Sequence, residues 1–226
     1  AFVQGYSGAA ALPLEAVVRM AYNPNLEASW FGSISEVINQ ITMLSIILTG
    51  AALIREREHG TIEHLLVMPV TPLEIMLAKV WAMGLVVLIA CALSLRLVVQ
   101  DWLGVPIQGA VSLFLAGTAL HLFATTSMGI FLGTVARSMP QLGLLIILVL
   151  IPLEILSGAV TPRESMPVVV QTIMSLAPTT HFVQLAQGVL LRGAGIGIIW
   201  PQLLALAAIG LVFFYAALRR LRTTLQ

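Results

Sequence analysis

Five apolar runs of membrane-spanning length dominate this 226-residue sequence. They lie at about 34–54, 75–99, 107–135, 141–160 and 196–218. A helix of about 20 residues spans the ~30 Å hydrocarbon core of a bilayer. Only 9% of the residues are charged, against roughly 25% in soluble domains. Because the runs are continuous rather than alternating in polarity, the sequence predicts an all-α membrane protein, a polytopic bundle with five transmembrane helices.

The basic residues indicate how these helices are oriented. Since successive loops alternate between the two sides, seven basic residues fall on one side and four on the other: Arg55, Arg57, Lys79, Arg137, Arg219, Arg220 and Arg222, against Arg19, Arg96, Arg163 and Arg192. Cytoplasmic loops carry the excess of Lys and Arg. We therefore expect the 55–79 segment and the C-terminus to be cytoplasmic. Five spans place the termini on opposite sides, and the chain begins at Ala1, so we expect an earlier span to be missing.

The 55–79 segment is a dense polar region between the first two spans. It holds three of the 11 basic residues and four of the 10 acidic ones. Gly60 can end the preceding helix, Thr61 can cap a short helix at 62–68, and Pro69 stops it. A capping box at 71–74, completed by Glu74, then begins the next span. The short helix presents apolar residues to the cytoplasm, which favours docking to another protein.

The segment at 161–195 is predicted to be an external helical hairpin. Thr161, Pro162 and the acidic residue at 164 form a capping box, which predicts a helix at 166–176. Pro178 breaks that helix, and Thr180 can cap a second one that continues to 191. Neither piece reaches 18 residues, so we expect the hairpin to dip into the outer interface rather than span the membrane.

The sequence EREHGTIEHLLVMPV at 56–70, followed by Glu74 and Lys79, resembles the loop of ABC-2 type transporter permeases, most closely the bacterial drug-efflux-like subgroup. Weaker similarity covers 156–158, Pro162 and the Met166-Pro167 pair at the external hairpin. Residues 23–26 are similar to the end of the family's extracytoplasmic domain. The resemblance implies that residues 1–32 end that domain and that 33–226 form the transmembrane domain.

The resemblance also implies an assembly. It predicts six spans in the complete protein, two permeases (identical copies or paralogues), and a separate ATP-binding subunit that carries ATP and Mg. The 62–68 helix would be the coupling helix. The residues expected to couple to the ATPase are Arg57, Glu58, Gly60, Thr61, Glu63, Leu66, Pro69, Glu74 and Lys79. The residues expected to shape the external hairpin are Pro162, Met166, Pro167 and Pro178.

Two charged residues lie inside the predicted spans, Arg96 and Glu154. Intramembrane charges are costly, so we expect them to pair within or between subunits, or Glu154 to face the transport path. Snorkelling to the interface is the alternative for Arg96. Glu154 departs from the uncharged residue that the family usually has there. We expect His121 to be a packing histidine bonded to a neighbouring helix, and Cys91 a small buried side chain.

The sequence gives no reason to expect catalysis in this chain. Its one lysine, Lys79, lacks the glycine-rich run of a phosphate-binding loop. His59, Glu63 and His64 are spaced H-x-x-x-E-H, one residue longer than the inverted zincin pattern. We expect no catalytic residue, cofactor, metal or nucleic-acid partner here.

The expected function is that of a permease subunit of an ATP-driven exporter in a bacterial inner membrane, moving hydrophobic or amphipathic compounds. The alternatives are an ion-coupled secondary transporter, export of a polysaccharide or lipid-linked glycan by the same ABC mechanism, and a membrane-embedded enzyme. A secondary transporter needs acidic groups or broken helices at mid-membrane, for which Glu154 is the candidate.

Overall fold

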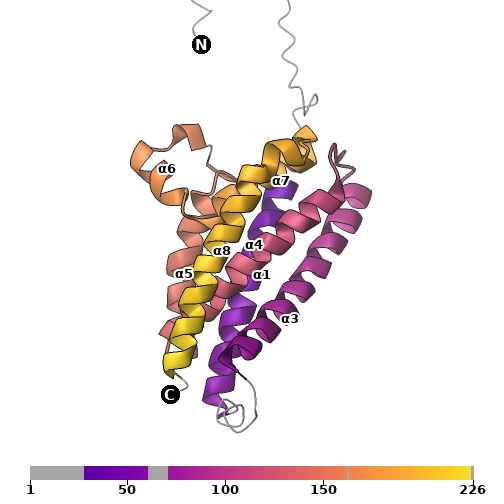
Figure 1. Cartoon of the computed structure of the whole chain (residues 1–226). Helices are drawn as coiled ribbons and strands as arrows, with labels where there is room; N and C mark the ends of the chain where they lie inside the picture. The colour runs from indigo at the N-terminus through magenta and orange to yellow at the C-terminus, as the bar shows by residue number, and fades with distance from the viewer. Residues whose placement is uncertain (1–27, 61–70, 162, 225–226) are drawn as a thin grey trace, which may run out of the picture.

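The computed structural model describes residues 28–60, 71–161 and 163–224, and every regular element in these ranges is helical. Figure 1 shows the bundle. The elements in chain order are α1 (Ala28–Glu58), α3 (Pro72–Leu93), the π-helix η1 (Ser94–Trp102), α4 (Val111–Val135), α5 (Met139–Ile155), the 3₁₀-helix η2 (Arg163–Ser165), α6 (Val168–Met174), α7 (Pro178–Arg192) and α8 (Ile196–Thr224). The all-α polytopic bundle predicted from the sequence is confirmed.

Within the described residues, four helical segments are long and apolar enough to cross a membrane: Gly32–Glu58, Pro72–Trp102, Val111–Val135 and Ile196–Arg222. The remaining predicted span, at 141–160, corresponds to α5, a shorter apolar helix of 17 residues that ends at Ile155. Pro152 weakens its last turn. Beyond it, the Ser157 hydroxyl bonds the Glu154 carbonyl oxygen and Gly158 takes a left-handed φ of 99°. The chain therefore turns away before the apolar run ends.

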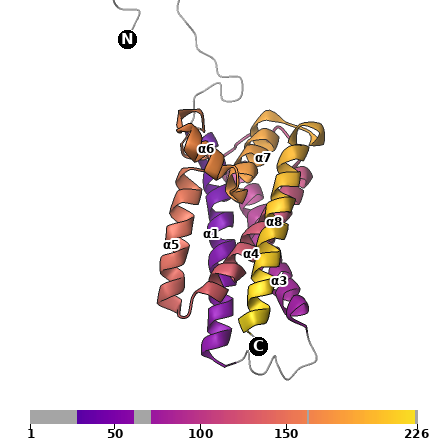
Figure 2. The same cartoon turned by 60° about the vertical axis from the view of Figure 1, so that its left-hand side comes forward.

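Helix α4 is the centre of the bundle. It packs against α8, α1, α3 and α7, and the two views in Figures 1 and 2 show it crossing between them. In the apolar stretch of 18 residues with which α4 could cross a membrane, 67% is buried, against 17% in the corresponding stretch of α8. A Cβ on Gly129 would lie 2.7 Å from the Ile46 carbonyl oxygen of α1. The small residues of α4 thus permit close helix packing.

A buried polar strip joins α1 to α4. Thr42 Oγ1 lies 2.9 Å from His121 Nε2, and the Ser45 hydroxyl donates to Thr125 Oγ1 at 2.7 Å. The His121 ring also stacks on Phe182 of α7, with centroids 4.1 Å apart and planes 6° apart. His121 is therefore a packing histidine bonded to a neighbouring helix, as predicted.

The hairpin at 161–195 differs in detail from the prediction. Helix α7 begins at Pro178 with Ala177 as its N-cap, so the prediction that Thr180 caps it is wrong. Proline suits the first helical position because its fixed φ is helical and its missing N–H has no partner there. Helix α6 is shorter than the predicted 166–176, since Met166 and Pro167 precede it. Pro162 lies outside the described residues.

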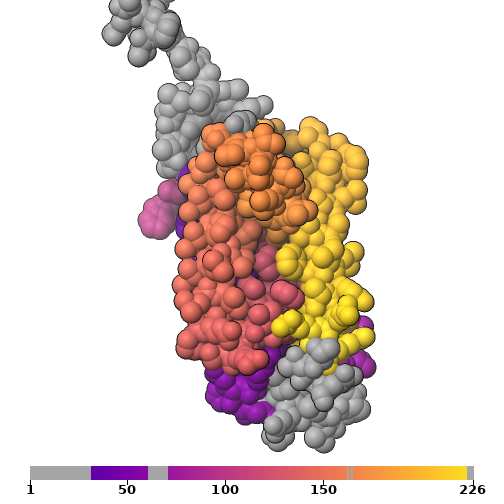
Figure 3. Space-filling view, turned by 90° about the vertical axis from the view of Figure 1, so that its left-hand side faces the viewer, coloured from indigo at the N-terminus to yellow at the C-terminus, as the bar shows by residue number. Residues whose placement is uncertain are grey.

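Helix α7 is packed into the bundle against α4 and α8. Its buried residues include Phe182, Leu185, Ala186 and Val189. Helix α5, by contrast, lies at the edge, where Figure 3 shows α5 and α6 on one face of the molecule beside α8. Leu144 and Leu148 of α5 are exposed at 71% and 70%. An apolar face of this kind suits lipid or a partner helix in the membrane.

Candidate functional site

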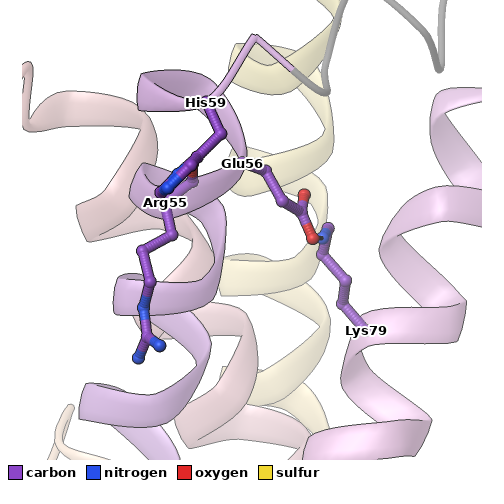
Figure 4. Close-up of polar contacts among 4 residues, drawn as sticks. All are labelled: Arg55, Glu56, His59 and Lys79. Carbon is purple, nitrogen blue, oxygen red and sulfur yellow. Dashed lines mark hydrogen bonds and ion pairs between the residues drawn. The ribbon is translucent and has the colours of Figure 1, made fainter.

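The two ends of the 55–79 segment are joined by an ion pair. Lys79 of α3 pairs with Glu56 of α1, and Figure 4 shows the two side chains pointing toward each other. The Lys79 side chain is 12% exposed and that of Glu56 is 32% exposed. On the same helix end, His59 Nδ1 lies 2.8 Å from the carbonyl oxygen of Arg55, one turn earlier. The pair holds the helix that enters the segment against the helix that leaves it.

The next two residues of α1 reach the turn between α4 and α5. Arg57 Nη1 donates a 2.8 Å hydrogen bond to the carbonyl oxygen of Ala136, which directly follows α4. The backbone N–H of Met139, the first residue of α5, donates to Glu58 Oε1 at 3.2 Å. A cation at a helix C-terminus and a carboxylate at a helix N-terminus both match the helix dipole. Three consecutive side chains thus tie α1 to α3, α4 and α5.

The capping box predicted at the start of α3 is present. Thr71 donates its backbone N–H to Glu74 Oε2 at 2.7 Å, and the Glu74 N–H donates to Thr71 Oγ1 at 3.3 Å. The residues of α3 that follow the capping box contribute to a buried apolar cluster of α1, α3, α4 and α8: Leu53, Met76, Val80, Ile130, Ala217 and Leu221. The start of α3 is therefore fixed both by its cap and by packing.

Of the residues predicted to couple to an ATPase, Arg57, Glu58, Gly60, Glu74 and Lys79 lie at this end of the bundle. Gly60 has a φ of 68°, the left-handed conformation expected of a glycine that ends a helix. The predicted helix at 62–68 lies outside the described residues, with four of the predicted positions: Thr61, Glu63, Leu66 and Pro69.

The prediction overlooked Glu56 and the turn after α4. Successive residues of a helix point about 100° apart, as 3.6 residues per turn requires. Three consecutive charged residues at a helix end therefore point toward three different neighbours. The alternating charges of Glu56, Arg57 and Glu58 could have predicted this from the sequence. Which backbone groups they reach depends on tertiary packing.

The two intramembrane charges are not brought together. Arg96 Nε lies 3.7 Å from Asp101 Oδ2, and its Nη1 donates to Gln100 Oε1 at 3.3 Å. Glu154 is half-buried in the last turn of α5. Within residues 28–60, 71–161 and 163–224, Arg96 thus pairs locally and not with Glu154. Pairing between subunits and a path-facing Glu154 stay predictions.

None of these contacts builds a metal centre. Across the described part of the chain, no group of three or more His, Cys, Asp and Glu side chains could hold a metal ion. What the contacts do at this end is join the helix ends that flank residues 61–70 in the chain to the turn between α4 and α5.

Comparison with known proteins agrees with this architecture. The profile of the ABC-2 type transporter family matches residues 18–191. The chain is 66% identical over 207 residues, 92% of its length, to the inner membrane transport permease YhhJ of Escherichia coli strain K12. It is 30% identical over 197 residues, 86% of its length, to the probable multidrug ABC transporter permease YbhR of the same strain.

The chain spans about half the length of these relatives, 55% of the first and 53% of the second. The family profile, however, covers well over half of the chain itself, and the four long apolar helices of the described residues are consistent with a polytopic permease. This chain belongs to the ABC-2 type transporter family.

Proposed function

We propose that this chain is the transmembrane permease part of an ATP-driven exporter, and that the 55–79 segment receives the motion of a separate ATP-binding subunit. The observation that carries the proposal is the anchoring of three consecutive residues of α1 to three other helices. Glu56 pairs with Lys79 of α3, Arg57 bonds Ala136 after α4, and Glu58 bonds Met139 of α5.

This anchoring supports coupling because packed helices move as units rather than deform continuously. A force applied at residues 61–70 acts on α1 and α3, which flank them. Through Arg57 and Glu58 the same force acts on the α4–α5 turn. Four helices therefore respond to one displacement, including α5, whose apolar face is exposed. Such a frame suits a mechanical input better than a chemical reaction.

In this proposal the 55–79 end of the bundle and the C-terminus are cytoplasmic. The seven basic residues counted above for that side support it. The bundle lies in a bacterial inner membrane, in keeping with the name of the first relative. It works as a pair of permeases, with ATP and Mg bound by the partner subunit, and the cargo is hydrophobic or amphipathic, in keeping with the multidrug name of the second relative.

The test uses the complete natural protein, co-purified with its ATP-binding subunit and reconstituted in vesicles. Glu58→Gln combined with Arg57→Met should lower ATP-driven export at least tenfold while the ATPase subunit stays bound. Arg55→Met, which removes an exposed charge from the same helix end, is the matched control and should leave export near the unmodified level.

Two results would contradict the proposal. One is the absence of any co-purifying ATPase. The other is export that persists without ATP and follows an imposed proton or sodium gradient, the behaviour of an ion-coupled secondary transporter. Both are read in the same vesicles by varying ATP and the ion gradient independently.

A further inference from the structure

A cavity of about 780 Å³ lies at the end of the bundle opposite the Glu56–Lys79 pair. Its walls are the segment after α5 at 157–160, one side of α7, and the first two turns of α8. These elements meet in the upper part of Figure 2. The cavity shares no lining residue with the 55–79 segment, so it is a separate site.

The lining is cationic and rich in amides. Arg163 and Arg192 line the cavity together with Gln184, Gln187 and Gln202. Among the described residues that line it, none is acidic. Two guanidinium groups facing one cavity with no carboxylate among them favour an anionic ligand, and guanidinium matches phosphate geometry especially well.

The walls of the cavity are fixed by backbone contacts. Gly193, at a φ of 65°, ends α7, and the N–H of Ala194 donates to the Gly188 carbonyl oxygen at 2.9 Å. On the opposite wall the Ser35 hydroxyl of α1 bonds the Ala159 carbonyl oxygen at 3.4 Å. The backbone of these walls is thus held in place before a ligand arrives, which lowers the entropy cost of binding.

The rim indicates that the ligand comes from the membrane. Ile198 of α8 and Val160 line the cavity and are 70% and 62% exposed. The rest of α8 has an apolar and largely uncovered surface, since only 17% of its membrane-spanning stretch is buried. An acyl chain can lie along this surface while its headgroup occupies the cavity. A soluble anion would gain nothing from it.

We propose that this cavity binds the phosphate of an anionic phospholipid from the membrane leaflet at that end of the bundle. The phosphate accepts hydrogen bonds from Arg163 and Arg192. The lipid is a bound structural component here, not the exported cargo. The inference is independent of the proposed function, because it uses neither the 55–79 segment nor ATP.

The test is lipid retention by the complete natural protein, purified in detergent and then incorporated into phosphatidylcholine nanodiscs with a small fraction of phosphatidylglycerol. Native mass spectrometry reports which lipid stays bound. The double variant R163Q/R192Q should lower the preference for phosphatidylglycerol at least tenfold, the effect of losing about 1.4 kcal/mol. Arg219→Gln, a charge change at the other end of α8, is the matched control for general attraction to anionic lipid and should keep the preference.

A second arm examines the source of the phosphate. Inorganic phosphate alone should neither raise the Tm of the detergent-solubilised protein nor displace the lipid, whereas added phosphatidylglycerol should raise the Tm. If inorganic phosphate matches phosphatidylglycerol, or if R163Q/R192Q retains as much lipid as Arg219→Gln, the lipid site is disproved. ATP-driven export measured on the same variants separates this outcome from failure of the proposed function.

Discussion

Arg57, near the end of α1, holds the end of α4 by donating a 2.8 Å hydrogen bond from Nη1 to the carbonyl oxygen of Ala136. Its Nε and Nη2 are buried and have no partner within the described residues. One guanidinium therefore satisfies a helix-terminal carbonyl that no intrahelical N–H can reach. The contact places a buried positive charge at the negative end of the α4 dipole.

Arg57→Met should lower the stability of the bundle. The substitution removes a charge-assisted hydrogen bond worth about 1.5–3 kcal/mol and leaves the Ala136 carbonyl without its side-chain partner. We expect a lower Tm in thermal unfolding of the detergent-solubilised protein. Arg55→Met, at an exposed position of the same helix end, should leave the Tm within experimental error. Equal Tm values for the two variants would contradict a structural role for the Arg57 contact.

The Glu56–Lys79 pair should respond to charge reversal. Lys79→Glu alone places two carboxylates next to each other between α1 and α3, and Glu56→Lys alone places two ammonium groups there. In either case the two like charges repel. The double variant E56K/K79E restores opposite charges. Since both side chains are partly exposed, we expect each single change to cost about 1 kcal/mol, near the upper end for such pairs. The double variant should recover most of that loss in Tm, and an additive loss would show that the pair contributes nothing.

Continuous apolar runs and capping residues predicted the helices well, because hydropathy and local hydrogen bonds act along the chain. The capping box from Thr71 to Glu74 and the left-handed Gly60 are local in this sense. The end of α5 was predicted too late because the apolar run continues past Ile155, although Pro152 and Gly158 interrupt the helix.

Other contacts could not be predicted from hydropathy, because they depend on the type of helix or on tertiary packing. Arg96 and Asp101 are five residues apart, and they meet on the π-helix from Ser94 to Trp102. A π-helix closes i→i+5 hydrogen bonds and so brings residues five apart into line. In the α-helix that the sequence predicted for these residues, the neighbours would be three and four residues apart instead. Likewise, the contacts of Arg57 and Glu58 join segments about 80 residues apart in sequence, and only tertiary packing determines them.

Gly129 and Gly143 should respond in opposite ways to alanine. A Cβ on Gly129 of α4 would lie 2.7 Å from the backbone oxygen of Ile46, which cannot move without shifting α1. A Cβ on Gly143 of α5 would meet nothing within 4 Å. Gly129→Ala should therefore cost about 1–3 kcal/mol through overpacking. Gly143→Ala should be neutral or add up to about 1 kcal/mol through helix propensity. Thermal unfolding of both variants checks the contrast, and a stabilised Gly129→Ala would refute the close α1–α4 contact.

The contact between Thr42 and His121 should appear as a coupling between the two helices. Thr42→Val keeps the side-chain shape but removes the partner 2.9 Å from His121 Nε2, while His121 Nδ1 already lacks a partner among the described residues. Leaving a buried ring nitrogen unpaired costs about 1–3 kcal/mol, whereas replacing both partners by apolar groups can be nearly neutral. Thr42→Val alone should therefore lower the Tm.

The double variant T42V/H121F tests this coupling. Phenylalanine at 121 can still stack on Phe182, whose ring lies parallel to that of His121. We expect the double variant to be more stable than the sum of the two single changes predicts, a positive interaction in a double-mutant cycle. Thr126→Val is the matched control, since within the described part of the chain that buried hydroxyl bonds only carbonyl oxygens of its own helix, and combined with His121→Phe it should give additive changes. Additive changes for the Thr42 cycle as well would mean that the hydrogen bond between α1 and α4 does not stabilise the bundle.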